Sequence, residues 1–230
     1  MITKIFDDLI EKINHELLTI LSLRGEFISK IDGSYVSKGD LLVDKIIFDF
    51  FSINFPTHEI ISEEIEQPSK ITWNEKGNYI IVDPIDGTEN FVSGLREWAV
   101  GICIYTQGKH EASCIYLPEL NEVLVSGQSL VKYKSRIVGL SSSLNRDDLM
   151  QLPKEGFEYR IIGCSMYNML AAIKGSFVRF ENVKGVNCWD ILPGLHLALE
   201  HGLTCYVDDK PYHGEILFPT QKYRIKLINQ

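Results

Sequence analysis

The chain has 230 residues, 45% of them hydrophobic, and a formal net charge of −8. This length and apolar content suit one compact unit, or two closely fused halves, with a large core. The negative charge argues against nucleic-acid backbone or an anionic membrane as the main partner, and no apolar run is long enough to span a bilayer.

The N-terminal part predicts two helices separated by a polar loop. Residues 3–24 repeat apolar side chains at helical spacing and are followed by Gly25, which favours a helix end. Residues 30–40 are polar and contain glycine, which predicts a loop. A second helix is predicted over 40–54, with Asp40 placed to cap it. The segment shows no signal-peptide pattern, so we expect a cytoplasmic protein.

Short apolar runs predict the strands of the first half. Residues 60–62 form a short strand before the acidic pair Glu63-Glu64, and 65–78 are a polar connector. Residues 79–82 predict a buried strand, whose ladder Pro84 is expected to end because proline has no backbone N–H. Three further strands complete an antiparallel meander, at 98–105, 111–117 and 121–126.

The second half alternates strands and helices, which predicts an α/β layer. Strands are expected at 137–141, 160–163, 176–180 and 223–228, and helices at 145–152, 165–174 and 189–201. No linker, repeat or low-complexity run separates the parts. We therefore expect an N-terminal half, 1–130, and a C-terminal half, 131–230, joined in one structural unit.

Cysteine and histidine offer no metal motif along the chain. The five cysteines are scattered without a Cys-x-x-Cys, which is typical of reduced core thiols. The six histidines contain no His-Glu-x-x-His, and His196 and His201 lie five residues apart. We interpret the histidines as surface residues or as neighbours that support a site.

The segment 83–88, Asp-Pro-Ile-Asp-Gly-Thr, predicts a cation site. Asp83 is expected at a strand end and Asp86 one short turn beyond it, where Gly87 permits a backbone bend. Two carboxylates this close repel each other unless a hard cation such as Mg²⁺ joins them. The alternative is that Asp86-Gly87 only forms a turn and binds no cation. Two residues separate these carboxylates, whereas phosphatases that form a phosphoaspartate usually have Asp-x-Asp. The chain also lacks the P-loop motif of P-loop NTPases.

This segment, together with Trp-Asp-Ile-Leu-Pro-Gly at 189–194, resembles the two signature motifs of the inositol monophosphatase family of Mg²⁺-dependent, lithium-sensitive phosphatases. The resemblance covers most of the chain and implies a layered α-β-α-β-α sandwich and a homodimer. It implies two to three Mg²⁺ ions, held by Glu63, Asp83, the Ile85 carbonyl, Asp86 and Asp190. Asp190 alone would otherwise be interpreted as a helix cap.

The resemblance also assigns catalytic roles. Asp40 and Thr88 are implied to position and deprotonate the attacking water, and Glu63 to bridge metals, while Glu64 is a supporting residue. Asp40 can serve as cap, as catalytic group or as both. Ser37 stands where the family usually has threonine.

Substrate contacts are implied at the signature residues Asp86, Gly87, Thr88 and Asp190. A second set precedes a predicted helix, where free N–H groups can hold an oxyanion: Gly163, Cys164 and Ser165. Glu181 corresponds to a family glutamate that contacts a ring hydroxyl, although its spacing to Asp190 is longer here.

The predicted function is Mg²⁺-dependent hydrolysis of a small phosphorylated polyol such as inositol monophosphate. An alternative in the same family is a 3′(2′),5′-bisphosphate nucleotidase, favoured by the loop 30–40 and by Lys210-Pro211. An alternative of another class is a non-catalytic regulator that binds Mg²⁺ and a phosphorylated ligand. The expected partners exclude nucleic acid and membrane.

Overall fold

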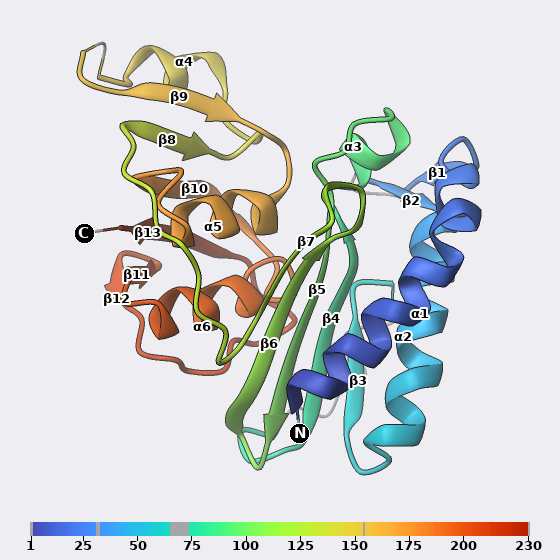
Figure 1. Ribbon diagram of the computed structural model, residues 1–230. Coiled ribbons are helices and arrows are strands. Elements are labelled where there is room, and N and C mark those ends of the chain that lie inside the picture. Colours follow the sequence, from blue (N-terminus) through green and yellow to red (C-terminus); the bar gives the residue numbers. More distant parts are fainter. Residues whose placement is uncertain (1, 31–32, 65–73, 154, 230) are drawn as a thin grey trace.

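The computed structural model describes residues 2–30, 33–64, 74–153 and 155–229. Part of the predicted loop, 31–32, and most of the predicted connector, 65–73, lie outside the described residues. The described chain folds into stacked layers of helix and sheet, which confirms the layered sandwich (Figure 1). None of the described helices combines the length and the apolar character that crossing a membrane requires.

Two long helices form the first layer, close to the predicted positions. They are α1 (Ile2–Ser22) and α2 (Lys38–Asn54), and they pack against each other and against one face of a sheet (Figure 1). Between them, β1 (Phe27–Ser29) and β2 (Tyr35–Ser37) form an antiparallel hairpin where a loop was predicted. The strands are three residues long and β1 is exposed, so no alternating hydrophobic pattern marks them.

The second layer is a five-stranded sheet with the order β3-β4-β5-β6-β7. Its strands are β3 (Glu59–Ser62), β4 (Tyr79–Asp86), β5 (Ala99–Thr106), β6 (Lys109–Leu117) and β7 (Glu122–Val125). The meander from β4 to β7 is antiparallel as predicted, but β3 pairs with β4 in parallel. The prediction of a purely antiparallel sheet was therefore wrong.

Two helices lie between this sheet and a second one, as Figure 1 shows: α5 (Ser165–Ile173) and α6 (Leu192–Glu200). The six-stranded sheet has the order β12-β11-β13-β10-β8-β9. Its strands are β8 (Ile137–Leu140), β9 (Glu158–Ile161), β10 (Arg179–Val186), β11 (Thr204–Val207), β12 (Lys210–Pro211) and β13 (Tyr223–Ile228). Strands β11 and β12 were not predicted, and β10 runs six residues past the predicted end at Phe180.

The short helix α4 (Arg146–Met150) connects β8 to β9 at the edge of the second sheet (Figure 1). Asn145 caps it as predicted, because its side chain accepts from the N–H of Asp148 and the Asp148 side chain accepts from the N–H of Asn145.

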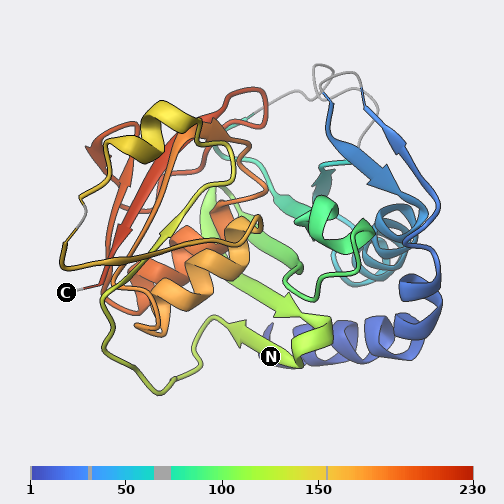
Figure 2. The ribbon, with the colours of Figure 1, turned by 90° about the horizontal axis from the view of Figure 1, so that it is seen from above.

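Both faces of the five-stranded sheet are buried, which explains the continuous apolar run of β4. Ile80 and Val82 point into the cluster shared with α1 and α2, whereas Tyr79 and Ile81 point into the cluster shared with α5 and α6. Figure 2, which views the layers from above, shows the helices on the two sides of this sheet. The cluster shared with α5 and α6 includes residues from both halves of the chain.

Candidate active site

A β-bulge directs the two signature carboxylates to the same face of the sheet. Strand β4 continues through Pro84 to Asp86, so the predicted strand end at Asp83 was wrong. Asp83 pairs with Gly101 and Asp86 with Ala99, so three steps on β4 oppose two on β5. In a regular strand, residues three apart point to opposite faces; the extra residue removes this mismatch.

Proline is tolerated there because β3 has ended. The parallel pairing of β3 and β4 stops at Ser62 and Val82, so none of the described strands on that side needs the N–H that Pro84 lacks. The only described neighbour of β4 at this level is β5, and the bulge interrupts that ladder too.

Three acidic side chains from three segments converge at the end of β4. One oxygen each of Glu63, Asp83 and Asp190 lies within 4.8 Å of the others. Asp83 is 1% exposed, and neither of its carboxylate oxygens receives a hydrogen bond from the described residues. Two carboxylate oxygens left without donors, beside two further acids, form the donor set that a hard divalent cation prefers.

Asp190 lies in the turn before α6 and does not cap it. The helix begins at Leu192, three residues after the predicted start at Trp189, and its N-cap is Ile191. The Asp190 carboxylate accepts from the N–H of Asn187 at 2.9 Å, which holds it toward Asp83. Pro193 is in the first turn of α6, where its missing N–H costs no helical hydrogen bond.

The N-terminus of α5 holds Asp86. Its carboxylate accepts from the backbone N–H of Met166 and from the Cys164 thiol at 3.0 Å. Burial raises the pKa of Asp86 to about 6, against the opposing effect of these hydrogen bonds. The predicted segment 163–165 therefore lies beside the signature, although its described contacts are with Asp86.

The acidic cluster is electrostatically costly without a cation. Burial, followed by the charges of Glu63 and Asp86, raises the pKa of both Asp83 and Asp190 well above the ordinary range. A bound divalent cation would reverse this effect by neutralising the carboxylates. The chemistry of the donor set thus fits Mg²⁺, with Glu63, Asp83, Asp86, Asp190 and the Ile85 carbonyl as the residues that would hold it.

Thr88 and Asp40 are in contact, as the resemblance implied. The Thr88 hydroxyl lies 3.1 Å from Asp40 Oδ1 and 3.1 Å from the Ile85 carbonyl oxygen, so it can donate to either. Thr88 begins the short helix α3 (Thr88–Val92), which was not predicted. Burial raises the pKa of Asp40, while hydrogen bonds from Ser37 and Thr88 oppose the shift.

Ser37, and not Asp40, is the N-cap of α2. The Ser37 hydroxyl oxygen accepts from the N–H of Asp40, and Asp40 Oδ2 accepts from the N–H of Ser37 at 2.9 Å. Asp40 is thus the third helical residue of a capping box. One oxygen closes the cap while the other faces Thr88, so the carboxylate has both contacts at once.

Lys30 places an ammonium group against the acidic pair. Its Nζ lies 3.1 Å from Glu63 and 2.9 Å from Glu64. Burial raises the pKa of Glu64 to about 7, although Lys30 opposes the shift. The ammonium partly neutralises the side of the cluster that faces the β1–β2 hairpin.

A cleft of about 270 Å³ opens at these residues. Gly163, Cys164 and Ser165 line it as predicted, together with residues that the sequence did not single out: Ser141, Ser142, Ser143, Asn168, Asn182, Asn187 and Lys222. The missed residues are serines, asparagines and one lysine from turns, from β10 and from α5, and none of them stands in a motif. Only the complete fold assembles them.

Glu181 is not among the residues that line this cleft, and its substrate contact stays a prediction. Successive residues of a strand point to opposite faces, so Phe180 and Asn182 line the cleft while Glu181 does not. The Glu181 carboxylate instead pairs with Arg179 at 3.0 Å and Lys226 at 3.3 Å. Asn182 is the residue of β10 that offers the cleft a polar side chain.

We expect Gly87→Ala to destabilise the chain by about 1–3 kcal/mol, because Gly87 has φ of +86° and a Cβ there would lie 3.0 Å from Cys164 Cβ. Chemical denaturation measures the loss. Gly94→Ala is the matched control, since Gly94 has φ of +80° with open space around it. An equal loss in both variants would mean that backbone strain alone, and not the close contact, limits position 87.

The comparisons with known proteins point to one family. Residues 16–136 match the model of the inositol monophosphatase family. The chain is 34% identical over 203 residues to the Nus factor SuhB of Pasteurella multocida, covering 76% of this chain and 73% of that protein. It is 27% identical over 178 residues to the Nus factor SuhB of Vibrio cholerae, covering 77% of this chain but 61% of that relative, less than two thirds of its length.

A solved structure has the same fold over the whole chain. It is described as an IMPase/NADP phosphatase complexed with Mg²⁺ and phosphate, and its TM-score is 0.83 at 20% identity. The match covers 100% of this chain and 90% of that one. At this identity the similarity establishes a common architecture, and the chemistry has to be argued from the residues of this chain.

Proposed function

Since the chain belongs to the inositol monophosphatase family, we propose that it is a Mg²⁺-dependent phosphomonoesterase that hydrolyses a small phosphorylated polyol such as inositol monophosphate. The observation that carries the proposal is Asp83, whose two buried oxygens have no donor among the described residues and lie beside Glu63 and Asp190. The adjacent Thr88–Asp40 contact supplies the groups that a water nucleophile needs.

Mg²⁺ bound by these carboxylates would neutralise the phosphate and lower the pKa of a bound water. The Thr88 hydroxyl donates a hydrogen bond to Asp40 Oδ1. A lone pair of the Thr88 oxygen is then free to accept a hydrogen bond from that water. As the water oxygen bonds to phosphorus, its proton passes to Thr88 and the Thr88 proton passes to Asp40. The ester oxygen leaves and takes a proton from a solvent water to form the alcohol, and Asp40 then returns its proton to solvent. No covalent enzyme intermediate is required.

The lining of the cleft supports a small, hydroxyl-rich substrate. Besides the acids, its lining includes neutral amide and hydroxyl groups, among them Asn182 and Ser141, and the cation Lys222. Such groups hydrogen-bond polyol hydroxyls without repelling a phosphate. The volume of about 270 Å³ suits a ligand the size of a sugar phosphate rather than an extended polymer.

The test is phosphate release with Mg²⁺ from inositol 1-phosphate, adenosine 3′,5′-bisphosphate and fructose 1,6-bisphosphate in parallel, with and without lithium. We expect turnover of inositol 1-phosphate above the others and inhibition by lithium. Preference for the bisphosphate nucleotide would favour the nucleotidase alternative. No release from any of the three, with Mg²⁺ binding intact, would contradict the proposal. Light scattering of the same sample checks the proposed homodimer.

We expect Asn182→Ala to raise KM about tenfold or more with a smaller change in kcat, because the side chain lines the cleft and its loss removes a hydrogen bond to the bound substrate. The donor is the amide nitrogen, since Oδ1 already accepts from the N–H groups of Lys184 and Gly185. Glu181→Gln, one residue away but outside the cleft, is expected to leave both constants near wild type. Steady-state kinetics on the best substrate measures both. A larger effect from Glu181→Gln than from Asn182→Ala would restore the sequence-based assignment of Glu181.

A regulatory binding function is the second candidate, because the relatives reported above are named Nus factors and not phosphatases. Under this candidate the cleft binds a ligand without turnover. An Asp40→Asn variant separates the two: it would lose hydrolysis under the first proposal and retain full function under the second. The expectation that nucleic acid is not a partner remains a prediction, and electrophoretic mobility shift of labelled RNA tests it.

A further inference from the structure

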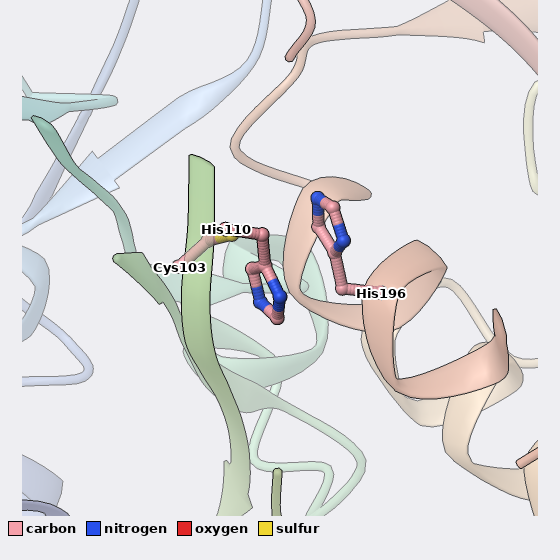
Figure 3. A group of neighbouring side chains, drawn as sticks. All are labelled: Cys103, His110 and His196. Atoms are coloured by element: carbon pink, nitrogen blue, oxygen red, sulfur yellow. The ribbon is translucent and has the colours of Figure 1, made fainter. Parts of the chain in front are cut away.

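A second cluster of metal-ligating side chains lies between the five-stranded sheet and α6, apart from the carboxylates. Cys103 is on β5, His110 on β6 and His196 on α6, and one donor atom of each lies within 4.8 Å of the others. Figure 3 shows the two imidazole rings side by side between the sheet and the helix, with the Cys103 sulfur beside them. His196 is only 6% exposed, so of its two predicted placements the one at the surface was wrong.

A β-bulge turns His110 into this cluster. Cys103 pairs with Ser113 and Ile104 with Ala112, but Tyr105 pairs with His110, so β6 contains one extra residue at this point. Without the bulge, Glu111 would oppose Tyr105 and face α6. The fold therefore places an imidazole, and not a carboxylate, against the buried thiol and His196.

Both imidazoles are in the neutral form that binds metals. Their rings stack with centroids 3.7 Å apart and planes inclined by 2°. Burial lowers the pKa of His110 to about 4 and the pKa of His196 to about 2. Two protonated rings at this separation would repel each other strongly, whereas neutral rings offer nitrogen lone pairs.

Neighbouring hydroxyl groups orient the three ligands. The Ser113 hydroxyl lies 2.8 Å from His110 Nε2 and donates to Cys103 Sγ at 3.4 Å. The hydroxyls of Tyr105 and Tyr212 lie 2.5 Å and 3.3 Å from His196 Nε2. Hydrogen bonds of this kind are typical of the residues that surround a metal site and fix its ligands.

We propose that Cys103, His110 and His196 bind a borderline-soft divalent transition ion such as Zn²⁺. One thiolate and two imidazoles are the donor types that zinc takes in proteins, in contrast to the all-oxygen set around Asp83. Zinc bonds of about 2.0–2.3 Å place tetrahedral ligands roughly 3.3–3.8 Å apart. Metal binding has to draw the donor atoms closer than the 4.8 Å within which they now lie, and it has to rotate the stacked rings so that their in-plane lone pairs converge.

Binding requires the thiol to lose its proton. Burial raises the pKa of Cys103 to about 12, so the metal-free thiol is protonated at neutral pH. As the sulfur–metal bond forms, this proton passes to solvent, and the neutral imidazoles release none. Three protein ligands leave one tetrahedral position for an oxygen ligand such as water.

Cobalt(II) spectroscopy tests the proposal, because Co²⁺ takes zinc positions and a thiolate ligand gives a charge-transfer band that carboxylates cannot give. The full chain is stripped with a chelator, saturated with Mg²⁺ to occupy the carboxylate site, and titrated with Co²⁺. We expect the band to saturate at one equivalent per chain, and excess Zn²⁺ to remove it.

Matched thiol variants identify the ligand. Cys103→Ser is expected to remove the band, whereas Cys205→Ser, another buried core thiol, is expected to retain it. Cys164→Ser is also expected to retain it, which excludes the thiol beside Asp86 as the source. Circular dichroism verifies folding, and His110→Asn provides a second disruption at a partly exposed position. Absence of the band in the folded wild type, or its persistence in Cys103→Ser, would overturn the proposal.

Discussion

Replacing Asp83 with Asn is expected to lower turnover roughly a thousandfold or more and, at the same time, to stabilise the metal-free chain. Turnover falls because the Asn amide cannot replace a carboxylate that holds the cation. The charge of the metal contributes several kcal/mol of transition-state stabilisation at a phosphoryl centre. The gain follows because Asp83 is buried among Glu63, Asp86 and Asp190 without a hydrogen-bond donor in the described chain.

The stability gain depends on pH with a definite sign. The pKa of Asp83 is raised well above its ordinary value in the folded chain, by burial first and then by Glu63. A carboxyl group of this kind is protonated in both states below the unfolded pKa, and stability is lost as pH rises through the folded pKa. Asp86, with its pKa raised to about 6, acts in the same direction.

We therefore expect the melting temperature of the metal-free wild type to fall between about pH 4 and neutral pH, and Asp83→Asn to reduce the fall. Mg²⁺ should raise the wild-type melting temperature at neutral pH and leave that of the variant almost unchanged. Asp44→Asn is the matched control, since Asp44 is a half-buried acid of α2 with a raised pKa, outside the cluster. An Asp83→Asn variant with near-normal turnover would contradict the assignment.

Replacing Asp40 with Asn is expected to reduce kcat by about 10²–10⁴-fold, the usual contribution of a general base, while Mg²⁺ affinity stays near wild type. The reason is geometric: Asp40 contacts Thr88 at 3.1 Å and is not among the acids clustered around Asp83. The measurement combines steady-state kinetics with calorimetric titration of Mg²⁺.

The capping role of Asp40 is separated from its catalytic role by Ser37→Ala. This variant opens the same capping box, at a cost of about 1 kcal/mol in stability, but leaves the Asp40 carboxylate beside Thr88. We expect Ser37→Ala to lose stability with most of its turnover retained. If Ser37→Ala and Asp40→Asn lost turnover equally, Asp40 would act through the helix terminus and not on the water.

The sequence predicted the long helices and the antiparallel meander because each buries a periodic apolar face. It also identified the residues that gather at the end of β4, since Asp83, Asp86 and Asp190 occur in motifs with a recognisable spacing. It missed the features that arise from backbone irregularity. The bulge at Pro84 and the one beside His110 each depend on pairing with β5, which lies elsewhere in the chain.

The placements of Glu181 and His196 depend on tertiary packing. A glutamate near a signature was interpreted as a substrate contact, but the alternation along β10 gives the cleft to Asn182 and pairs Glu181 with Arg179. A histidine without a local motif was interpreted as a surface residue or as a neighbour that supports a site, and α6 carries it into the interior against β5 and β6. In both cases the deciding information is which face of an element is covered, and that is set by tertiary packing.

The bulge in β4 also determines what transplanting this site would require. On a regular strand, Asp-Pro-Ile-Asp would set the two carboxylates about 10 Å apart along the chain and on opposite faces. Grafting these four residues onto another sheet would therefore place one acid on the wrong face of that sheet. The portable unit is the pair of strands β4 and β5 with their shifted register, so sequence identity in the motif is insufficient without a neighbouring strand that accepts the extra residue.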